Sequence, residues 1–223
     1  MQTIEPVLVF ALLLNFFILG NSRMWAVIYA VAVQGAALGA MYPIAHQQGL
    51  YGSGPEPWST IAWLTVLTLA IIGIKGILIP RLLFRAMRDA DIQWHIESAI
   101  GILPSLLIGA AGASLALVFA RRLPLVGGHT SALVIPAALA TMLTGFLVLI
   151  TRKLVLSQVL GYILLENGIF IFGLLLIEAV PILVELGVVL DLVVCVFVMG
   201  IIINHVNRSL PAATAEHLST LRE

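Results

Sequence analysis

Two carboxylates lie where a membrane-spanning segment seldom carries a charge. Glu166 is near the middle of an apolar run over 154–177, and Asp191 is near the middle of the next run, over 181–206. A charge there costs about 2.5–3.5 kcal/mol on insertion scales, so each acid needs a partner, a water-filled cavity or a bound proton. Consecutive antiparallel helices bring both acids to a similar depth in the membrane. This placement predicts that they share a proton path.

Polar residues continue along the helix that carries Glu166. Gln158 and Tyr162 precede it at i−8 and i−4, a spacing that stacks side chains on one face, and Ser157 and Asn167 widen the stripe. We expect this face to avoid lipid and Tyr162 to join the relay. Both acids also fit a structural role, in which a neutral carboxyl holds two helices together. Three glycines of the same run permit a close helix neighbour or a local break: Gly161, Gly168 and Gly173.

A lysine lies within the third apolar run. Lys75 is close to the C-terminal end of that run and shares a helix face with Thr65 and Thr68. Two roles fit it. Its long stem can carry the ammonium to the nearby interface, or the ammonium can pair with Glu97 in a second stage of the relay. His95 is a candidate proton donor to that stage, although a histidine at an interface is also often simply solvated.

Apolar segments position these residues. Of the 223 residues, 61% are hydrophobic and 10% are charged, which is typical of an all-α integral membrane protein. Eleven basic residues balance eleven acidic ones, so the charge gives no reason to expect nucleic acid as a partner. A span needs about 20 apolar residues. The predicted spans, of which the first is short, are 5–20, 24–45, 58–80, 96–120, 131–150, 154–177 and 181–206.

The basic residues predict the orientation of these seven helices, because cytoplasmic loops retain Lys and Arg. The loops after helices one, three and five and the C-terminal tail share one side of the membrane. That side holds Arg23, Arg81, Arg85, Arg88, Arg152, Lys153, Arg208 and Arg222. The opposite side holds only Arg121 and Arg122. We therefore expect the N-terminus outside and the C-terminus in the cytoplasm.

The segment after the third span has the pattern of a basic amphipathic helix. Arg81, Arg85 and Arg88 recur at i, i+4 and i+7, opposite a run of apolar residues. This spacing predicts a helix on the membrane surface. It would serve either as an anchor on anionic lipid or as a dock for a peripheral protein arm.

Motifs of several enzyme classes are absent. The single cysteine, Cys195, excludes an internal disulfide, a cysteine-ligated iron–sulfur cluster and a cysteine zinc cage. There is no phosphate-binding glycine loop, no nucleophile elbow and no metal-binding His-Glu pair, which argues against an ATP-driven pump or a membrane hydrolase. We expect no catalytic centre, cofactor or metal in this chain.

The last three spans resemble a known family. The run 152–170, RKLVLSQVLGYILLENGIF, followed by a span with Asp191, resembles the K subunit of NADH–quinone oxidoreductase and the C subunit of multisubunit cation/proton antiporters. In those relatives the second and third helices each carry a membrane-embedded acid. Glu166 matches the first acid. Asp191 stands in the place of the second, where the quinone reductase subunit usually has Glu.

The chain as a whole resembles the family of hydrogenase-4 component E, a membrane subunit of group-4 nickel–iron hydrogenases and formate hydrogenlyase-type complexes. The resemblance implies a four-helix membrane extension over 1–130, a three-helix proton-relay module over 131–208 and a short cytoplasmic tail over 209–223. It also implies a multi-pass protein of the prokaryotic cytoplasmic, or inner, membrane.

By the same resemblance, the chain is a non-redox subunit that couples hydrogenase chemistry to proton translocation through its buried carboxylates. The implied partners are antiporter-like membrane subunits, a membrane subunit of the quinone-reductase H type, a peripheral hydrogenase arm and lipid. The nickel–iron centre and the iron–sulfur clusters would belong to partner subunits. Two alternatives stay open: a subunit of a multisubunit sodium/proton antiporter, and a purely structural scaffold subunit whose acids remain neutral.

Overall fold

Backbone groups in an apolar environment must be satisfied within their own segment, and helices do this for each apolar run of the chain. The computed structural model describes residues 4–47, 58–89, 99–122, 131–173 and Gly200. Every regular element in these stretches is a helix, as the sequence predicts. The helices are α1 (Ile4–Gly20), α2 (Met24–Gln47), α3 (Trp58–Gly73), the π-helical turn η1 (Ile74–Leu78), α4 (Ile79–Asp89), α5 (Ile102–Arg122), α6 (Val134–Thr151) and α7 (Val155–Gly173).

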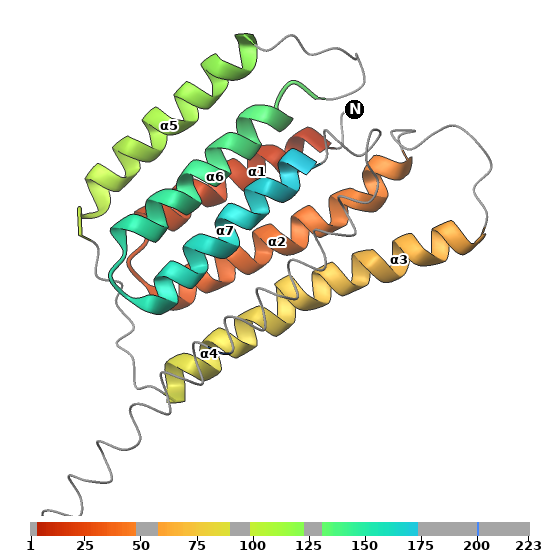
Figure 1. The fold of residues 1–223 in the computed structure, drawn as a ribbon, viewed down its shortest axis with the longest axis horizontal. Helices are drawn as coiled ribbons and strands as arrows, with labels where there is room; N and C mark the ends of the chain where they lie inside the picture. Colours follow the sequence, from red (N-terminus) through yellow and green to blue (C-terminus); the bar gives the residue numbers. More distant parts are fainter. Residues whose placement is uncertain (1–3, 48–57, 90–98, 123–130, 174–199, 201–223) are drawn as a thin grey trace, which may run out of the picture.

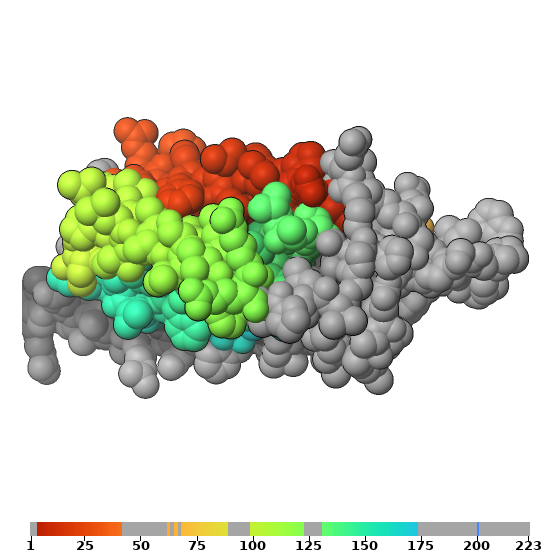
Figure 2. Space-filling model, turned by 90° about the horizontal axis from the view of Figure 1, so that it is seen from above, coloured from red at the N-terminus to blue at the C-terminus, as the bar shows by residue number. Residues whose placement is uncertain are grey.

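Four helices form the centre of the bundle. Helix α6 packs along α7, α1 packs on α2 and α6, and α2 packs on α7. Helix α5 lies along one edge against α6 and α1, and α3 and α4 lie along the opposite edge beside α2 (Figure 1). The outer face of α5 is open in Figure 2, and Leu103, Leu107 and Leu115 on it are exposed. This apolar face suits contact with lipid or with another membrane subunit.

Four helices of the described part are long and apolar enough to cross a membrane: Met24–Met41 within α2, Ile102–Arg122, Val134–Thr151 and Val155–Gly173. Helix α1 is apolar but shorter. Apart from Gly200, the predicted span 181–206 and the tail 209–223 lie outside the described residues, so the count of seven spans and the orientation stay predictions. The fourth predicted span starts later than expected, at Ile102, because Gly101 before it has a left-handed φ of 74°.

The third helix does not end where the basic segment begins. α3, η1 and α4 follow one another without a break and form one rod in Figure 1. Arg81, Arg85 and Arg88 are on its exposed side, whereas Leu83 and Met87 are buried in the core. The amphipathic helix is therefore confirmed, and its apolar side packs on the protein's own core, whereas its place on the membrane surface stays a prediction. Periodicity indicates an apolar face without indicating whether lipid or the protein's own helices will cover it.

Helices α6 and α7 approach each other through three glycines. A Cβ on Gly145 would lie 2.5 Å from the Leu165 backbone nitrogen, and one on Gly161 would lie 2.8 Å from that of Leu149. A Cβ on Gly168 would lie 2.6 Å from the backbone nitrogen of Met142. Small residues allow this close approach of membrane helices. The prediction of a close neighbour is confirmed for Gly161 and Gly168, whereas a Cβ on Gly173 would meet no described atom within 4 Å.

We expect Gly145→Ala to destabilise the bundle, because the added methyl group meets backbone atoms of Leu165 and Gly161 that cannot move independently. Overpacking of this kind costs about 1–3 kcal/mol. Thermal unfolding in a mild detergent measures the loss. Gly173→Ala on α7 is the matched control, since its methyl group enters open space. Equal unfolding temperatures for the two variants would contradict this account of the α6–α7 contact.

Candidate functional site

A layer of buried polar side chains crosses the middle of the bundle. On α1, α2, α6 and α7 these residues lie between two apolar core clusters, one at each end of the helices. On α7, for example, Leu160 and Leu164 belong to one cluster and Ile171 to the other. The polar layer consists of Asn15, Gln34, Lys75, Thr141, Glu166 and Asn167, each at most 5% exposed. Apolar packing therefore separates this layer from both ends of the bundle.

The charged centre of the layer is an ion pair between η1 and α7. The Lys75 Nζ lies 3.7 Å from the Glu166 Oε1, and the two side chains are 3% and 6% exposed. The same ammonium donates a hydrogen bond to the Asn167 Oδ1 at 3.1 Å and lies 5.7 Å from the centre of the Phe170 ring. Lys75 therefore points into the bundle and does not extend to the interface.

Three amide side chains and one hydroxyl continue the network away from Lys75. Asn167 Nδ2 donates to the Gln34 Oε1 at 3.3 Å, and Gln34 Nε2 donates to the Asn15 Oδ1 at 2.9 Å. Asn15 Nδ2 donates in turn to the Thr141 Oγ1 at 2.8 Å. Side chains from η1, α7, α2, α1 and α6 are thus joined in one connected chain of hydrogen bonds.

The lysine determines the donor-to-acceptor direction of this series of hydrogen bonds. An ammonium group can only donate, so Asn167 must turn its oxygen toward Lys75 and its NH₂ group toward Gln34. The same orientation is then imposed on Gln34 and Asn15. Hydrogen bonds aligned in one direction polarise one another, which strengthens each of them.

Glu166 is the incomplete member of the layer. Neither of its carboxylate oxygens has a hydrogen-bond partner in the described part of the chain, although both are buried. At 3.7 Å the Lys75 ammonium provides an ionic contact and not a hydrogen bond of good geometry. A buried acid with spare acceptor sites can take up a proton without first breaking a hydrogen bond. This is the chemical property that a proton carrier needs.

Two local features place Lys75 in this layer. It is the second residue of the π turn, in which the Ile79 N–H donates to the Ile74 carbonyl oxygen. Such turns insert one residue into a helix, redirect the side chains around them and are frequent at functional sites. Gly35 on α2 supplies the space, since a Cβ there would lie 3.0 Å from Lys75 Cβ and 3.5 Å from the Asn167 Oδ1. The lysine reaches α7 by passing this glycine.

The predicted polar face of α7 is not continuous. Tyr162 is 39% exposed and Gln158 is also exposed, whereas Glu166 is buried. Residues eight positions apart on a helix differ by about 80° around its axis, so Gln158 and Glu166 face different neighbours. Ser157 and Asn167 are on the buried side. The other predicted relay residues, Asp191, Glu97 and His95, lie outside the described residues.

Asn15, Gln34 and Thr141 belong to the site and were not predicted from the sequence. Each is an uncharged polar residue inside an apolar run, and charge was the signal used to identify Glu166 and Lys75. Any hydrogen-bonding side chain at the middle of a span needs an internal partner, which is a broader signal. Among the described residues, no group of three or more His, Cys, Asp or Glu side chains is arranged to hold a metal ion.

A second buried cation lies apart from this layer. Arg152 follows the last residue of α6 and is 2% exposed. Its Nη2 donates to the Leu19 carbonyl oxygen near the C-terminal end of α1 at 3.3 Å. Desolvation lowers the pKa of the Arg152 guanidinium, which nevertheless stays charged because arginine titrates far above neutral pH. A cation beside helix C-termini is favourable, so this residue ties α1 to α6.

Thr141→Val tests whether the network stabilises the bundle. Valine keeps the shape of threonine and removes the acceptor for Asn15. We expect a loss of about 0.6–1.7 kcal/mol, the average and upper values for hydrogen bonds between membrane helices. Unfolding in mixed micelles measures it. Thr144→Val is the control on the same helix, because Thr144 donates to the Ala140 carbonyl oxygen within α6. Equal losses in both variants would argue that the interhelical bond contributes nothing.

The chain has relatives along nearly its whole length. It is 31% identical over 214 residues to the uncharacterized protein Rv0085 of Mycobacterium tuberculosis, covering 95% of this chain and 92% of that protein. It is 27% identical over 167 residues to hydrogenase-4 component E of Escherichia coli strain K12, covering 74% of this chain and 72% of that protein. Hydrogenase-4 component E of Shigella flexneri is equally similar.

No family model and no solved structure matches the chain. The identity to the mycobacterial protein and the coverage of both chains are high enough to place the two proteins in one family. The identity to hydrogenase-4 component E is lower and indicates a distant relative. The chain therefore belongs to the same family as Rv0085 of Mycobacterium tuberculosis and is distantly similar to hydrogenase-4 component E.

Proposed function

We propose that this chain is a membrane subunit of a hydrogenase-like complex and that its Lys75–Glu166 pair takes part in moving protons across the membrane. The observation that carries the proposal is the pair itself, which is 3.7 Å apart and buried between two apolar clusters. The distant similarity to hydrogenase-4 component E supports the type of complex. Charged groups inside membrane helices are usually kept for a function because they are costly to bury.

The chemistry of the pair suits coupling. In a layer of low dielectric constant, a lone buried charge is far more costly than an ion pair or a neutral pair. A proton that moves from the Lys75 ammonium to the Glu166 carboxylate converts the ion pair into a neutral amine and a neutral carboxylic acid. The two states differ in their interaction with any charge nearby, so a change of charge on a neighbouring group shifts the proton. Redox chemistry on partner subunits would act on the pair in this way.

The amide chain keeps the pair in place for this transfer. Asn167 donates to Gln34, and its oxygen accepts from Lys75, so the ammonium is restrained beside Glu166. The unpartnered oxygens of Glu166 are where a water molecule or a further acid would bring or remove the proton. We assign that role to Asp191, Glu97 and His95, with Tyr162 as an additional donor. We further propose that the chain assembles with antiporter-like membrane subunits and with a hydrogenase arm that carries the metal centres.

Glu166→Gln is the direct test. The amide keeps the size of the side chain and cannot carry the proton, so proton transport by the intact complex should fall by about tenfold or more, whereas assembly and electron transfer persist. A pH-sensitive dye inside vesicles that contain the purified complex measures transport. Glu5→Gln is the control, because Glu5 is an exposed acid at the start of α1, where it accepts a hydrogen bond from Ser131.

The alternatives give different results in the same assay. Unchanged proton transport in the Glu166→Gln complex would overturn the proposal and would favour a purely structural role for this subunit. Transport that depends on sodium, in a complex that contains no nickel, would favour the multisubunit antiporter. Mass spectrometry and metal analysis of the purified complex identify the partner subunits and any nickel directly.

Gly35→Ala tests the position of the lysine without altering either charge. The added Cβ would lie 3.0 Å from Lys75 Cβ and 3.1 Å from Lys75 Cδ, so the lysine stem must shift away from α2 and its position beside Glu166 changes. We expect slower proton transport, with a smaller loss than in Glu166→Gln, and normal assembly. Gly112→Ala on α5 is the control, since its methyl group would meet Leu143 at an ordinary distance of 3.5 Å. Equal transport rates in both glycine variants would show that the lysine tolerates displacement.

A further inference from the structure

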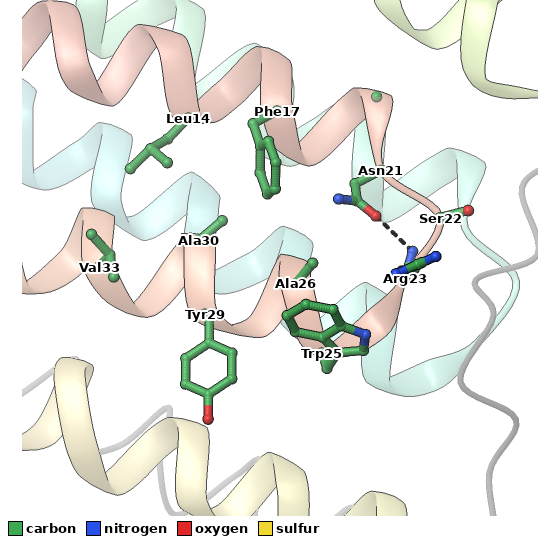
Figure 3. Close-up of a pocket in the computed structure, with 11 residues that line it drawn as sticks. Leu14, Phe17, Asn21, Ser22, Arg23, Trp25, Ala26, Tyr29, Ala30 and Val33 are labelled. Carbon is green, nitrogen blue, oxygen red and sulfur yellow. Dashed lines mark hydrogen bonds between the residues drawn. The ribbon is translucent and has the colours of Figure 1, made fainter.

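A groove separate from the polar layer lies between α1 and α2, where the two helices join. It has a volume of about 550 Å³ and runs from the turn over 20–22 along both helices. Phe17 points from α1 toward α2, and Leu14 lies further along the groove, across from Ala30 and Val33 (Figure 3). The walls are apolar for most of this length. An extended hydrocarbon chain matches them.

One end of the groove is polar and positively charged. Asn21, Ser22 and Arg23 close it, and Asn21 Oδ1 accepts a hydrogen bond from the Arg23 backbone N–H at 2.8 Å (Figure 3). The side chain of Arg23 is exposed. It directly precedes α2, whose N-terminal end carries a partial positive charge, and the first turn of α2 holds no acidic residue to offset it. An anion bound here would therefore gain from two positive features at once.

Aromatic side chains border the charged end. Trp25 is 43% exposed and Tyr29 is 55% exposed, and both line the groove. Trp and Tyr are enriched where membrane and water meet, because their rings are amphipathic. Arg23 is also one of the basic residues on the predicted cytoplasmic side. In the predicted topology, the charged end of the groove is at the depth of lipid headgroups, and its apolar length extends toward the interior of the membrane.

We propose that this groove binds an anionic phospholipid. The headgroup phosphate pairs with the Arg23 guanidinium, and one acyl chain lies along Phe17, Leu14 and Val33. Along the groove, a cation is followed by interfacial aromatic rings and then by an apolar channel. The chemical groups of a phospholipid follow one another in the same order. Charge complementarity at Arg23 selects an anionic headgroup over a zwitterionic one.

Photoactivatable lipids test the proposal on the full chain, purified with its native partners in bilayer discs. One probe is phosphatidylglycerol and the other is phosphatidylcholine, each with the same light-activated group on an acyl chain. We expect the anionic probe to label α1 and α2 peptides of the groove about fivefold more than the neutral probe, the ratio given by one cation near an anionic headgroup. Peptide mass spectrometry locates the labels.

Three variants make the result specific to Arg23. Arg23→Gln should reduce labelling by phosphatidylglycerol to the level of phosphatidylcholine, and Arg23→Lys should largely preserve the preference. Lys153→Gln is the control, because Lys153 is an exposed cation in the α6–α7 turn, on the same predicted side, and does not line the groove. The proposal is wrong if both probes label equally, or if Arg23→Gln leaves the preference intact. Absence of label in the groove would also overturn it and would indicate that a segment of another subunit fills this space.

Discussion

An ammonium group in the middle of an apolar bundle must find acceptors inside the protein, because no bulk water is there to solvate it. Lys75 finds an amide oxygen on Asn167 at 3.1 Å and a carboxylate oxygen on Glu166 at 3.7 Å. This requirement orients Asn167, and through it Gln34 and Asn15, since an ammonium can only donate. One cation therefore orients the hydrogen bonds that join α7, α2 and α1.

The rest of the bundle isolates that cation. An apolar cluster lies on each side of the polar layer, so neither end of the bundle gives direct access to it through the described core. On the α6–α7 side, Gly145, Gly161 and Gly168 bring two backbones into contact and leave no room for side chains between them. On the α2 side the reverse holds, because Gly35 leaves room for the stem of Lys75. Glycines thus allow close backbone contact between α6 and α7, and a glycine on α2 leaves space for the Lys75 side chain.

The sequence was sufficient to predict which side chains are costly to bury in a membrane, and insufficient to predict which helices pack against one another. Charge inside an apolar run identifies Glu166 and Lys75, and apolar length predicts α1, α2, α6 and α7 to within a few residues. The contact between Lys75 and Glu166 was not predicted, because it depends on the lateral arrangement of helices, and every span is apolar almost all round. The π turn at Lys75 was also not predicted, since it follows from packing and has no sequence pattern of its own.

The π turn also determines what is mechanically connected to the ion pair. α3, η1 and α4 form one rod, with Lys75 in its middle section and Arg81, Arg85 and Arg88 on the exposed side of its last section. A helix is stiff along its axis, so any contact that held the arginines in place would also restrain the position of Lys75 along the rod relative to Glu166. The π turn is the section of the rod that departs from α-helical geometry, since the Ile79 N–H donates to the Ile74 carbonyl oxygen. A change in that turn alters the Lys75–Glu166 distance without requiring α6 and α7 to separate. The ion pair can therefore respond to the rod while the glycine-packed part of the bundle stays fixed.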